Sequence, residues 1–274
     1  MRKRLVQIIV TLLGLAATGM SAVAAELVIP GSGDCEFILN RLAAEFEKAQ
    51  SGRRVHVPPS TGSTGGVIAV LQNEAVLARI ARPLKAEEAQ AGLKSAVFAR
   101  DAVVFAVGEK VTVKSLTAAQ LADLFGGRVG NWREVGGEPG PVRLVVREEG
   151  ESSIVQLRAR LEPFRTLKMG ENAKMVAKTG EMIELLTRYK TSIGWATNSS
   201  VLAAGTALRP LALDGTSATA ALVASGKYPV ATEYALVYRE ERLNAEAREF
   251  LAFVRGAAAQ DLLRKLGVSP AGRG

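Results

Sequence analysis

Three short clusters of glycine, serine and threonine are the parts of this chain best suited to chemistry. The clusters are Gly31-Ser32-Gly33, Ser60-Thr61-Gly62-Ser63-Thr64-Gly65-Gly66 and Gly150-Glu151-Ser152-Ser153, the last preceded by Arg147. Each cluster opens a helix-like apolar pattern. Glycine lets the backbone approach a ligand closely, while hydroxyls and the free N–H groups of a helix start present hydrogen-bond donors. Three such clusters with one arginine indicate a cage for a small anion.

Charge and aromatic content narrow the class of partner. The 274 residues include 35 Lys and Arg against 27 Asp and Glu, a formal net charge of +8, and aromatic residues make up 5%. The basic residues are spread along the chain. Because nucleic-acid surfaces need clustered basic residues or stacking aromatic side chains, no nucleic-acid partner is expected. A mild positive field would instead help to steer an anion inward.

Cysteine and histidine usage argues against metal chemistry and enzymatic catalysis. The chain has one cysteine, Cys35, and one histidine, His56. No metal or cofactor is therefore expected, and no internal disulfide forms. Cys35 is interpreted as a small buried residue, with a reactive thiol at a helix start as the alternative. His56 lies in an alternating strand pattern and is interpreted as a packed residue, and Trp132 and Trp195 are expected in the core.

The first 25 residues have the composition of a cleavable signal peptide. Basic residues at positions 2–4 precede an apolar stretch from Leu5 to Ala17, and small residues supply a cleavage site near Ala24 and Ala25. The apolar stretch is short for a membrane span, so an uncleaved anchor is the less favoured alternative. We therefore expect export to the periplasm.

The anion cage must be positioned by strands that end at the glycine clusters. Leu27–Ile29 predicts a strand that leads into the first cluster, and Asp34 is the expected N-cap of the following helix. Arg54–Val57 predicts a second strand that leads into the second cluster, and a helix follows from Val67. This repeated strand, turn and helix predicts a parallel α/β sheet.

Similar patterns continue to the end of the chain. Four more strands and five more helices are predicted: strands 103–107, 142–146, 192–195 and 234–238, and helices 116–125 (with Thr117 as N-cap), 154–161, 179–189, 245–254 and 257–266. We interpret the order as two α/β lobes that face a cleft, where ligands collect at strand ends. The first lobe is assigned residues 26–107 and 230–274, and the second lobe residues 108–229.

At this point the motifs resemble a known family, the periplasmic phosphate-binding proteins of ABC importers, which have the two-lobed type II solute-binding fold. The matching segments are Pro58–Gly66, Ala81–Lys85 with its Arg-Pro-Leu, Leu116–Phe125 through Asn131-Trp132 and Gly136-Gly137, Arg147–Ser153, Ile193–Trp195 and Tyr228-Pro229. The resemblance spans nearly the whole chain after the signal peptide. It implies an α/β fold with a ligand cleft between the lobes.

The resemblance also implies a set of ligand-binding residues. Ser63 donates its hydroxyl to an anion oxygen with Thr64 adjacent, and Arg147 makes a charge-assisted contact. Ser152 and Ser153 fall on the family's Gly-Thr pair at a helix start. In the first cluster, beside Ser32, Cys35 falls where the family often has a hydroxyl, and its thiol is a weaker donor.

Two departures from the family bear on which anion binds. Ala81 occupies a position where well-known members have an aspartate that accepts a proton from hydrogenphosphate. Glu151 falls where the family has serine. Either Glu151 takes over the proton-accepting role, which would keep phosphate as the ligand, or it points outward near the helix start. In the second case sulfate or another tetrahedral oxyanion stays open.

The resemblance implies a monomeric, exported solute-binding protein without enzymatic activity, which captures a tetrahedral oxyanion and docks to an ABC permease. Phosphate is favoured. One alternative is a periplasmic hydrolase, which would lack a credible base and a Gly-x-Ser-x-Gly elbow. The other is a sensor or interaction protein that keeps the fold without transport. Arg79 and Arg82 are expected to form structural ion pairs rather than ligand contacts.

Overall fold

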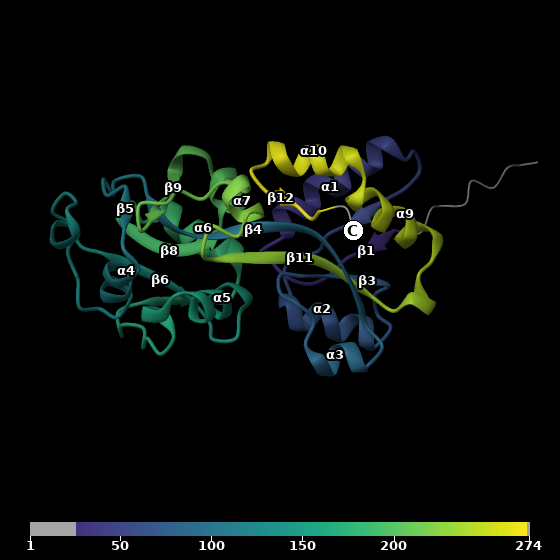
Figure 1. Ribbon diagram of the computed structural model, residues 1–274, viewed down its shortest axis with the longest axis horizontal. Helices are drawn as coiled ribbons and strands as arrows, with labels where there is room; N and C mark the ends of the chain where they lie inside the picture. Colours follow the sequence, from purple (N-terminus) through teal and green to yellow (C-terminus); the bar gives the residue numbers. More distant parts are fainter. Residues whose placement is uncertain (1–25, 273–274) are drawn as a thin grey trace, which may run out of the picture.

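A computed structural model of the protein describes residues 26–272, so the signal-peptide prediction for residues 1–25 lies outside the described residues. Two lobes lie side by side and are joined by two long strands, β4 (Lys94–Gly108) and β11 (Ala231–Tyr238), which run between them (Figure 1). Within residues 26–272, no helix combines the length and apolar character that a membrane crossing requires.

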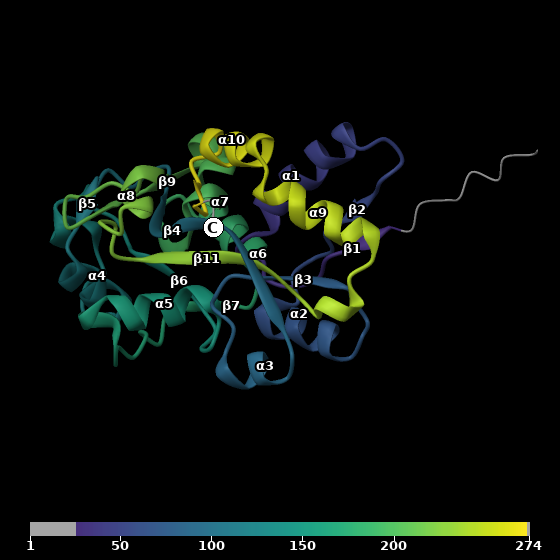
Figure 2. The ribbon, with the colours of Figure 1, turned by 45° about the vertical axis from the view of Figure 1, so that its right-hand side comes forward.

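The first lobe has helices on both faces of its strands. In two views, α1, α9 and α10 lie on one side of β3 and β11, and α2 and α3 lie on the other (Figures 1 and 2). The further elements are β1 (Leu27–Val28), α1 (Glu36–Ala49), β2 (Val55–His56), α2 (Gly62–Leu71), β3 (Leu77–Ile80), α3 (Ala86–Gln90), η4 (Glu240–Arg242), α9 (Ala245–Arg255), α10 (Ala257–Lys265) and β12 (Ser269–Pro270).

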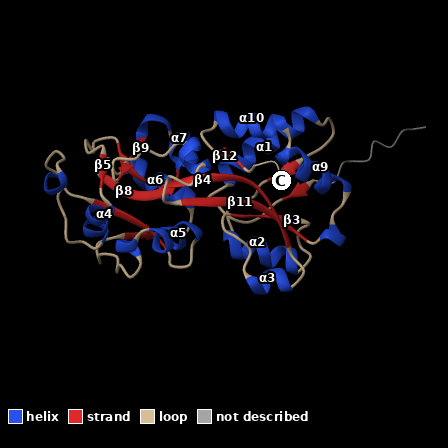
Figure 3. Ribbon diagram, viewed as in Figure 1, coloured by secondary structure: helices blue, strands red, loops and turns tan. Residues whose placement is uncertain are grey.

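The second lobe is built from the middle of the chain. Its helices also flank strands, with α7 on one side and α4 and α5 on the other (Figure 3). Its elements are β5 (Ser115–Leu116), α4 (Ala118–Phe125), η1 (Trp132–Val135), β6 (Arg143–Arg147), α5 (Ser152–Arg160), η2 (Glu162–Phe164), β7 (Lys174–Val176), α6 (Thr179–Arg188), β8 (Ser192–Thr197), α7 (Asn198–Ala203), η3 (Gly205–Ala207), β9 (Leu208–Pro210), β10 (Ala212–Leu213) and α8 (Ala220–Ala224).

The main sheet is mixed, so the prediction of a parallel sheet is wrong in part. Among the described residues, eight strands form one sheet with the central order β3-β11-β4-β8-β6-β7. The β1–β2, β6–β7 and β6–β8 pairs are parallel, as the strand-helix alternation predicts. However, β4 pairs antiparallel with both β11 and β8. The β4–β11 pair is antiparallel because the chain passes between the lobes along β4 and returns along β11.

β4 belongs to two separate hydrophobic cores. Its first half contributes Ala96, Phe98 and Ala99 to a cluster with α1 and α9, whereas residues 102–107 pack in the core of the second lobe. The packing therefore favours a crossing between Ala99 and Ala102, earlier than the predicted boundary after residue 107. Trp132 and Trp195 lie in the core of the second lobe, as predicted.

Local signals predicted the helix starts unevenly. Thr117 caps α4 as expected: its hydroxyl accepts a hydrogen bond from the N–H of Gln120 at 3.1 Å, and the Gln120 side chain accepts one from Thr117 N–H at 2.9 Å. The assignment of Asp34 as the N-cap of α1 is wrong. Cys35 occupies that position without a side-chain cap, and the Asp34 side chain points toward the second lobe instead.

Candidate functional site

Two helix starts from different lobes meet at a pair of serines. Ser63 lies in the first turn of α2, and Ser152 is the first residue of α5; both are buried, and their Oγ atoms are 3.0 Å apart. The backbone N–H of Ala81 also donates to Ser63 Oγ at 3.1 Å. The glycine-hydroxyl clusters that precede α2 and α5 are therefore brought together, and the N-terminal ends of both helices lie at this place.

Arg147, at the end of β6, is linked to this region through Glu151, the residue before Ser152, and its side chain is 3% exposed. Its Nη1 donates to Thr179 Oγ1 at 2.9 Å, and its Nη2 donates to the Ala177 carbonyl at 3.1 Å. Nη2 also forms an ion pair with Glu151 Oε1 at 2.7 Å. The Nε–H is buried and has no hydrogen-bond partner among the described residues. Arg147 thus keeps one buried donor unused.

Glu151 faces inward and caps α5. Its Oε2 accepts hydrogen bonds from the backbone N–H of Ser153 at 3.0 Å and from Ser153 Oγ at 2.8 Å, while Oε1 pairs with Arg147. The alternative in which Glu151 points outward is therefore wrong. Because its carboxylate offsets the Arg147 charge, the buried Arg147 and the half-buried Glu151 together form a nearly neutral pair.

Asp34 is a second carboxyl at this place and is fully buried, and the sequence interpretation missed it. Its Oδ1 accepts a hydrogen bond from Thr179 Oγ1 at 3.0 Å, across the two lobes, and its Oδ2 is buried with no partner among the described residues. The pKa of Asp34 is raised to about 7, chiefly by burial and also by the charge of Glu151, while the charge of Arg147 opposes the rise. The signal available was an acid placed directly after Gly31-Ser32-Gly33.

The backbone carbonyl of Asp34 is also hydrogen-bonded to side chains of β11 and β8. Its carbonyl accepts hydrogen bonds from the Tyr234 hydroxyl at 2.9 Å and from Thr197 Oγ1 at 3.3 Å. Tyr234 donates as well to Asp101 Oδ2 at 3.0 Å, and burial raises the pKa of Asp101 to about 6. The loop before α1 is therefore held to β8, β11 and, through Tyr234, β4, so Asp34 lies at the joint between the lobes.

Three other predicted ligand residues have different surroundings. Ser32 is buried, and its Oγ accepts a hydrogen bond from Asp34 N–H at 3.3 Å. Cys35 packs in the core of the first lobe, where burial raises the pKa of its thiol to about 12, so the reactive-thiol alternative is wrong. Thr64 is exposed. Within residues 26–272 none of these side chains hydrogen-bonds to the second lobe, and their contact with an anion stays a prediction.

The remaining arginine predictions are confirmed, and that for histidine is wrong. Arg79 is buried, donates to the carbonyls of Ser32 at 2.8 Å and Pro58 at 2.7 Å, and pairs with Glu36 at 3.2 Å. Arg82 makes a two-pronged pair with Glu88 at 2.6 and 2.8 Å. Both are structural, as expected. His56 was expected to be packed, but it is exposed on β2 because the alternating pattern turns it outward.

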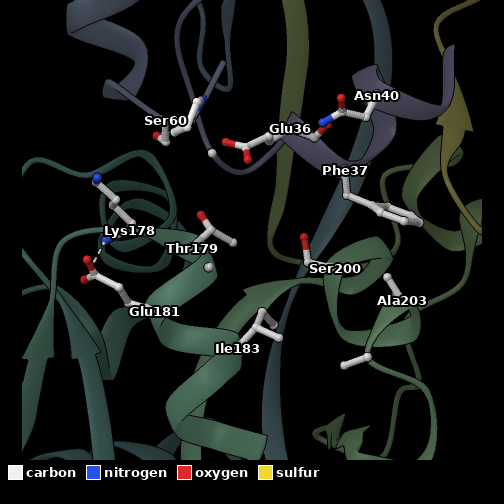
Figure 4. A pocket seen from close by; sticks show the side chains of 14 residues that line it. Glu36, Phe37, Asn40, Ser60, Lys178, Thr179, Glu181, Ile183, Ser200 and Ala203 are labelled. Carbon is white, nitrogen blue, oxygen red and sulfur yellow. Dashed lines mark hydrogen bonds between the residues drawn. The ribbon is translucent and has the colours of Figure 1, made fainter. Parts of the chain in front are cut away.

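A cavity of about 540 Å³ opens between the lobes beside Asp34 and Thr179. Its walls come from the start of α1, the loop before α2, the start of α6 and the end of α7; Figure 4 shows the side chains that line it. Thr179 lines this cavity and also accepts a hydrogen bond from Arg147, and Gly33, another lining residue, packs against Thr179. Ser63, Arg147 and Ser152 do not line it.

The sequence matches one family model over most of its length. The model, described as the PBP superfamily domain, covers residues 16–257. The chain belongs to this superfamily. The relatives described next are named for phosphate binding and transport and not for hydrolysis, so the hydrolase alternative is not supported.

Individual relatives agree with this assignment. The phosphate-binding protein PstS of Borreliella burgdorferi is 25% identical over 249 residues, which cover 87% of this chain and 88% of the relative. A Clostridium perfringens structure, described as a phosphate ABC transporter substrate-binding protein with bound phosphate, has a TM-score of 0.81 at 25% identity and covers 90% of this chain and all of that one. An ABC-type phosphate transport receptor from Vibrio cholerae, at 22% identity with a TM-score of 0.64 and a coverage of 90% of this chain and 100% of its own, shows the fold alone.

These comparisons confirm two predictions from the sequence. The chain is a two-lobed α/β binding protein, and its resemblance to the periplasmic phosphate-binding proteins is a family relationship.

Proposed function

We propose that the protein is an exported, monomeric solute-binding protein that captures a tetrahedral oxyanion, with phosphate favoured, and delivers it to an ABC permease. The observation that carries the proposal is the meeting of Ser63 and Ser152 at 3.0 Å beside the buried Arg147. The relatives named for phosphate binding and transport support the choice of ligand.

The hydrogen-bond donors around Ser63 and Ser152 could stabilise a buried anion. The proposed contacts are the hydroxyls of Ser63, Ser152 and Ser153, the guanidinium of Arg147 and backbone N–H groups at the starts of α2 and α5. Each helix start carries the equivalent of about half a positive charge. Burying an ion is tolerable only when such donors are already in place, because an unpaired buried charge is very costly. Since the donors come from both lobes, the anion would hold them together, as in hinge closure around a ligand.

Two carboxyls beside the donors would discriminate between an anion that carries a proton and one that is fully deprotonated. Ala81 supplies no carboxylate, and Glu151 is the proposed acceptor of the proton on hydrogenphosphate. Asp34, whose pKa is about 7, is the second acidic group, and it is connected to Arg147 through the Thr179 hydroxyl. A carboxylate that must accept a proton repels a fully deprotonated anion such as sulfate, so phosphate would be preferred.

A ligand panel tests the proposal on protein freed of carried-over ligand. Thermal shifts are measured with phosphate, sulfate, molybdate, tungstate and arsenate, and affinities follow by calorimetry. We expect Arg147→Ala to weaken phosphate binding by about 2–5 kcal/mol because the buried anion loses its charged partner.

Arg143→Ala is the matched control. Arg143 begins the same strand, is exposed and lies over the Tyr189 ring, so its loss should leave phosphate affinity unchanged. Equal affinities for the two variants would remove Arg147 from the site. Absence of binding by every anion in the panel would refute the proposed function.

A further inference from the structure

The pairing of β6 with β7 brings Thr179 to Arg147. The two strands run parallel with Arg147 opposite Val176, so the chain that follows β7 turns into α6 beside the guanidinium. That turn supplies two acceptors: the Ala177 carbonyl, 3.1 Å from Arg147 Nη2, and Thr179 Oγ1, 2.9 Å from Arg147 Nη1. Because each acceptor takes a different terminal nitrogen, the two together fix the plane of the guanidinium.

The Thr179 hydroxyl has a single hydrogen, and it donates that hydrogen to the other lobe. Thr179 Oγ1 donates to Asp34 Oδ1 at 3.0 Å, while it accepts from Arg147. A hydroxyl that accepts from a charged donor becomes a better donor itself, so the two hydrogen bonds strengthen each other. Arg147, Thr179 and Asp34 thus form one chain of hydrogen bonds, and its last bond joins the second lobe to the first.

The first lobe holds Asp34 close to Thr179. Ser32 Oγ accepts a hydrogen bond from Asp34 N–H at 3.3 Å, and the Asp34 carbonyl accepts one from the Tyr234 hydroxyl at 2.9 Å. The neighbouring Gly33 lies so near the second lobe that an added Cβ would be 3.0 Å from Thr179 Oγ1. The lack of a side chain at Gly33 therefore allows the loop before α1 to approach the start of α6.

All three residues of this chain of hydrogen bonds are buried: Arg147, Thr179 and Asp34 are 4%, 5% and 1% exposed. Thr179 lies on one wall of the cavity between the lobes, with Ser60 and Glu36 of the first lobe on the opposite wall (Figure 4). Because water has little access to the buried groups, loss of the Thr179 hydroxyl would leave a cationic donor and a carboxyl oxygen without a partner.

We propose that Thr179 is a positioning residue that makes the orientation of Arg147 depend on contact between the two lobes. With the lobes together, Asp34 holds the Thr179 hydroxyl, and the hydroxyl directs Arg147 Nη1. With the lobes apart, the hydroxyl loses Asp34 and is free to turn away from the guanidinium. Arg147 is therefore fully oriented for an anion only in the closed protein. This inference rests on the proposed oxyanion function and adds a residue that acts through Arg147 rather than on the ligand.

Calorimetry with inorganic phosphate, on protein freed of carried-over ligand, tests the role of the hydroxyl. Thr179→Val replaces the hydroxyl by a methyl group and should weaken phosphate affinity about tenfold or more, as for a lost hydrogen bond to a charged group. Thr179→Ser keeps the hydroxyl and should bind phosphate almost as tightly as the wild type. Thr187→Val is the matched control: it makes the same change at an exposed position of α6 and should leave the affinity unchanged.

A double-mutant cycle tests whether the effect depends on the first lobe. Asp34→Ala removes the acceptor of the Thr179 hydroxyl, and Thr179→Val is measured both in the wild type and in this background. The charge change at position 34 cancels, because both members of the second pair carry it. The loss of phosphate affinity caused by Thr179→Val should be smaller by about threefold or more in the Asp34→Ala background. Urea unfolding checks that each variant is folded. If Thr179→Val does not fold, Thr179→Ala replaces it, since it also lacks the hydroxyl.

Three outcomes overturn the inference and leave the proposed function standing. The first is wild-type phosphate affinity in Thr179→Val. The second is a Thr179→Ser variant as weak as Thr179→Val, which would assign the effect to packing rather than to the hydroxyl. The third is an equal effect of Thr179→Val in both backgrounds, which would confine the role of the hydroxyl to the second lobe. Failure of the wild type to bind phosphate is different, because it refutes the choice of ligand in the proposed function and the inference with it.

Discussion

Asp34→Asn is the substitution that best tests the electrostatics of the joint between the lobes. Asparagine keeps an oxygen that can accept the Thr179 hydroxyl, which lies 3.0 Å from Asp34 Oδ1 in the wild type. It removes the charge that burial opposes. The variant therefore separates the cost of burying a carboxylate from the benefit of the hydrogen bond that links the two lobes.

The expected magnitude follows from the pKa of Asp34, which rises from 3.8 to about 7 in the folded protein. The folded protein holds a proton that the unfolded chain releases above about pH 4, so the stability contributed by this group is complete below that pH. That stability is lost as the pH rises through about 7. A shift of this size corresponds to a change in unfolding free energy on the order of 4 kcal/mol at most.

Urea unfolding of ligand-free protein across the range from about pH 4 to about pH 8 measures this effect. Asp34→Asn should match the wild type at the acidic end and exceed it increasingly as the pH rises. Asp261→Asn, which changes an exposed carboxyl on α10, should give a difference that does not vary in this way. A difference between Asp34→Asn and the wild type that stays constant over the whole range would refute the reasoning.

Three further predictions concern ligand choice, the first glycine turn and the core. Glu151→Gln should shift the calorimetric affinity ratio from phosphate toward sulfate, since it removes the proposed proton acceptor; an unaltered ratio would end that role. Gly31→Ala should prevent folding, as judged by circular dichroism, because φ is 136° and a Cβ would lie 1.9 Å from the Arg79 carbonyl oxygen; a native spectrum would contradict this. Phe125→Ala should cost about 3–5 kcal/mol in urea unfolding, since the ring packs on Trp195 at 5.1 Å between centroids, and a loss below about 1 kcal/mol would contradict that packing role.

Much of the fold could be predicted because the deciding signals are local. The Thr117-x-x-Gln120 capping pattern predicted the start of α4, and apolar periodicity predicted the two final helices within one residue at each start. Whether neighbouring strands run parallel or antiparallel could not be predicted from such local signals. β4 pairs antiparallel with β11 and β8, which are distant in the sequence, and no local pattern within Lys94–Gly108 indicates these partners. Orientation is a property of the assembled sheet.

In the candidate site, too, the residues with a local sequence signal could be predicted and those that depend on distant contacts could not. Ser63, Arg147 and Ser152 were identifiable because each belongs to a short cluster with a recognisable spacing; the structure brings Ser63 into contact with Ser152 and pairs Arg147 with Glu151. Asp34 and Thr179 were missed. Their roles depend on a hydrogen bond between positions 145 residues apart, and each side chain has an ordinary local interpretation at a helix start. Sequence patterns identify donors on loops but not the partner that a distant loop supplies.

Because β4 belongs to the cores of both lobes, the two lobes cannot be separated without disrupting at least one of them. One strand supplies buried side chains to the first lobe through Phe98 and to the second through Phe105, and β11 pairs with it across most of the crossing. Cutting the chain between the lobes would strip one of them of a central strand and expose an unpaired edge. Neither half is an independent folding module, so chemical denaturation should reveal one cooperative transition instead of two.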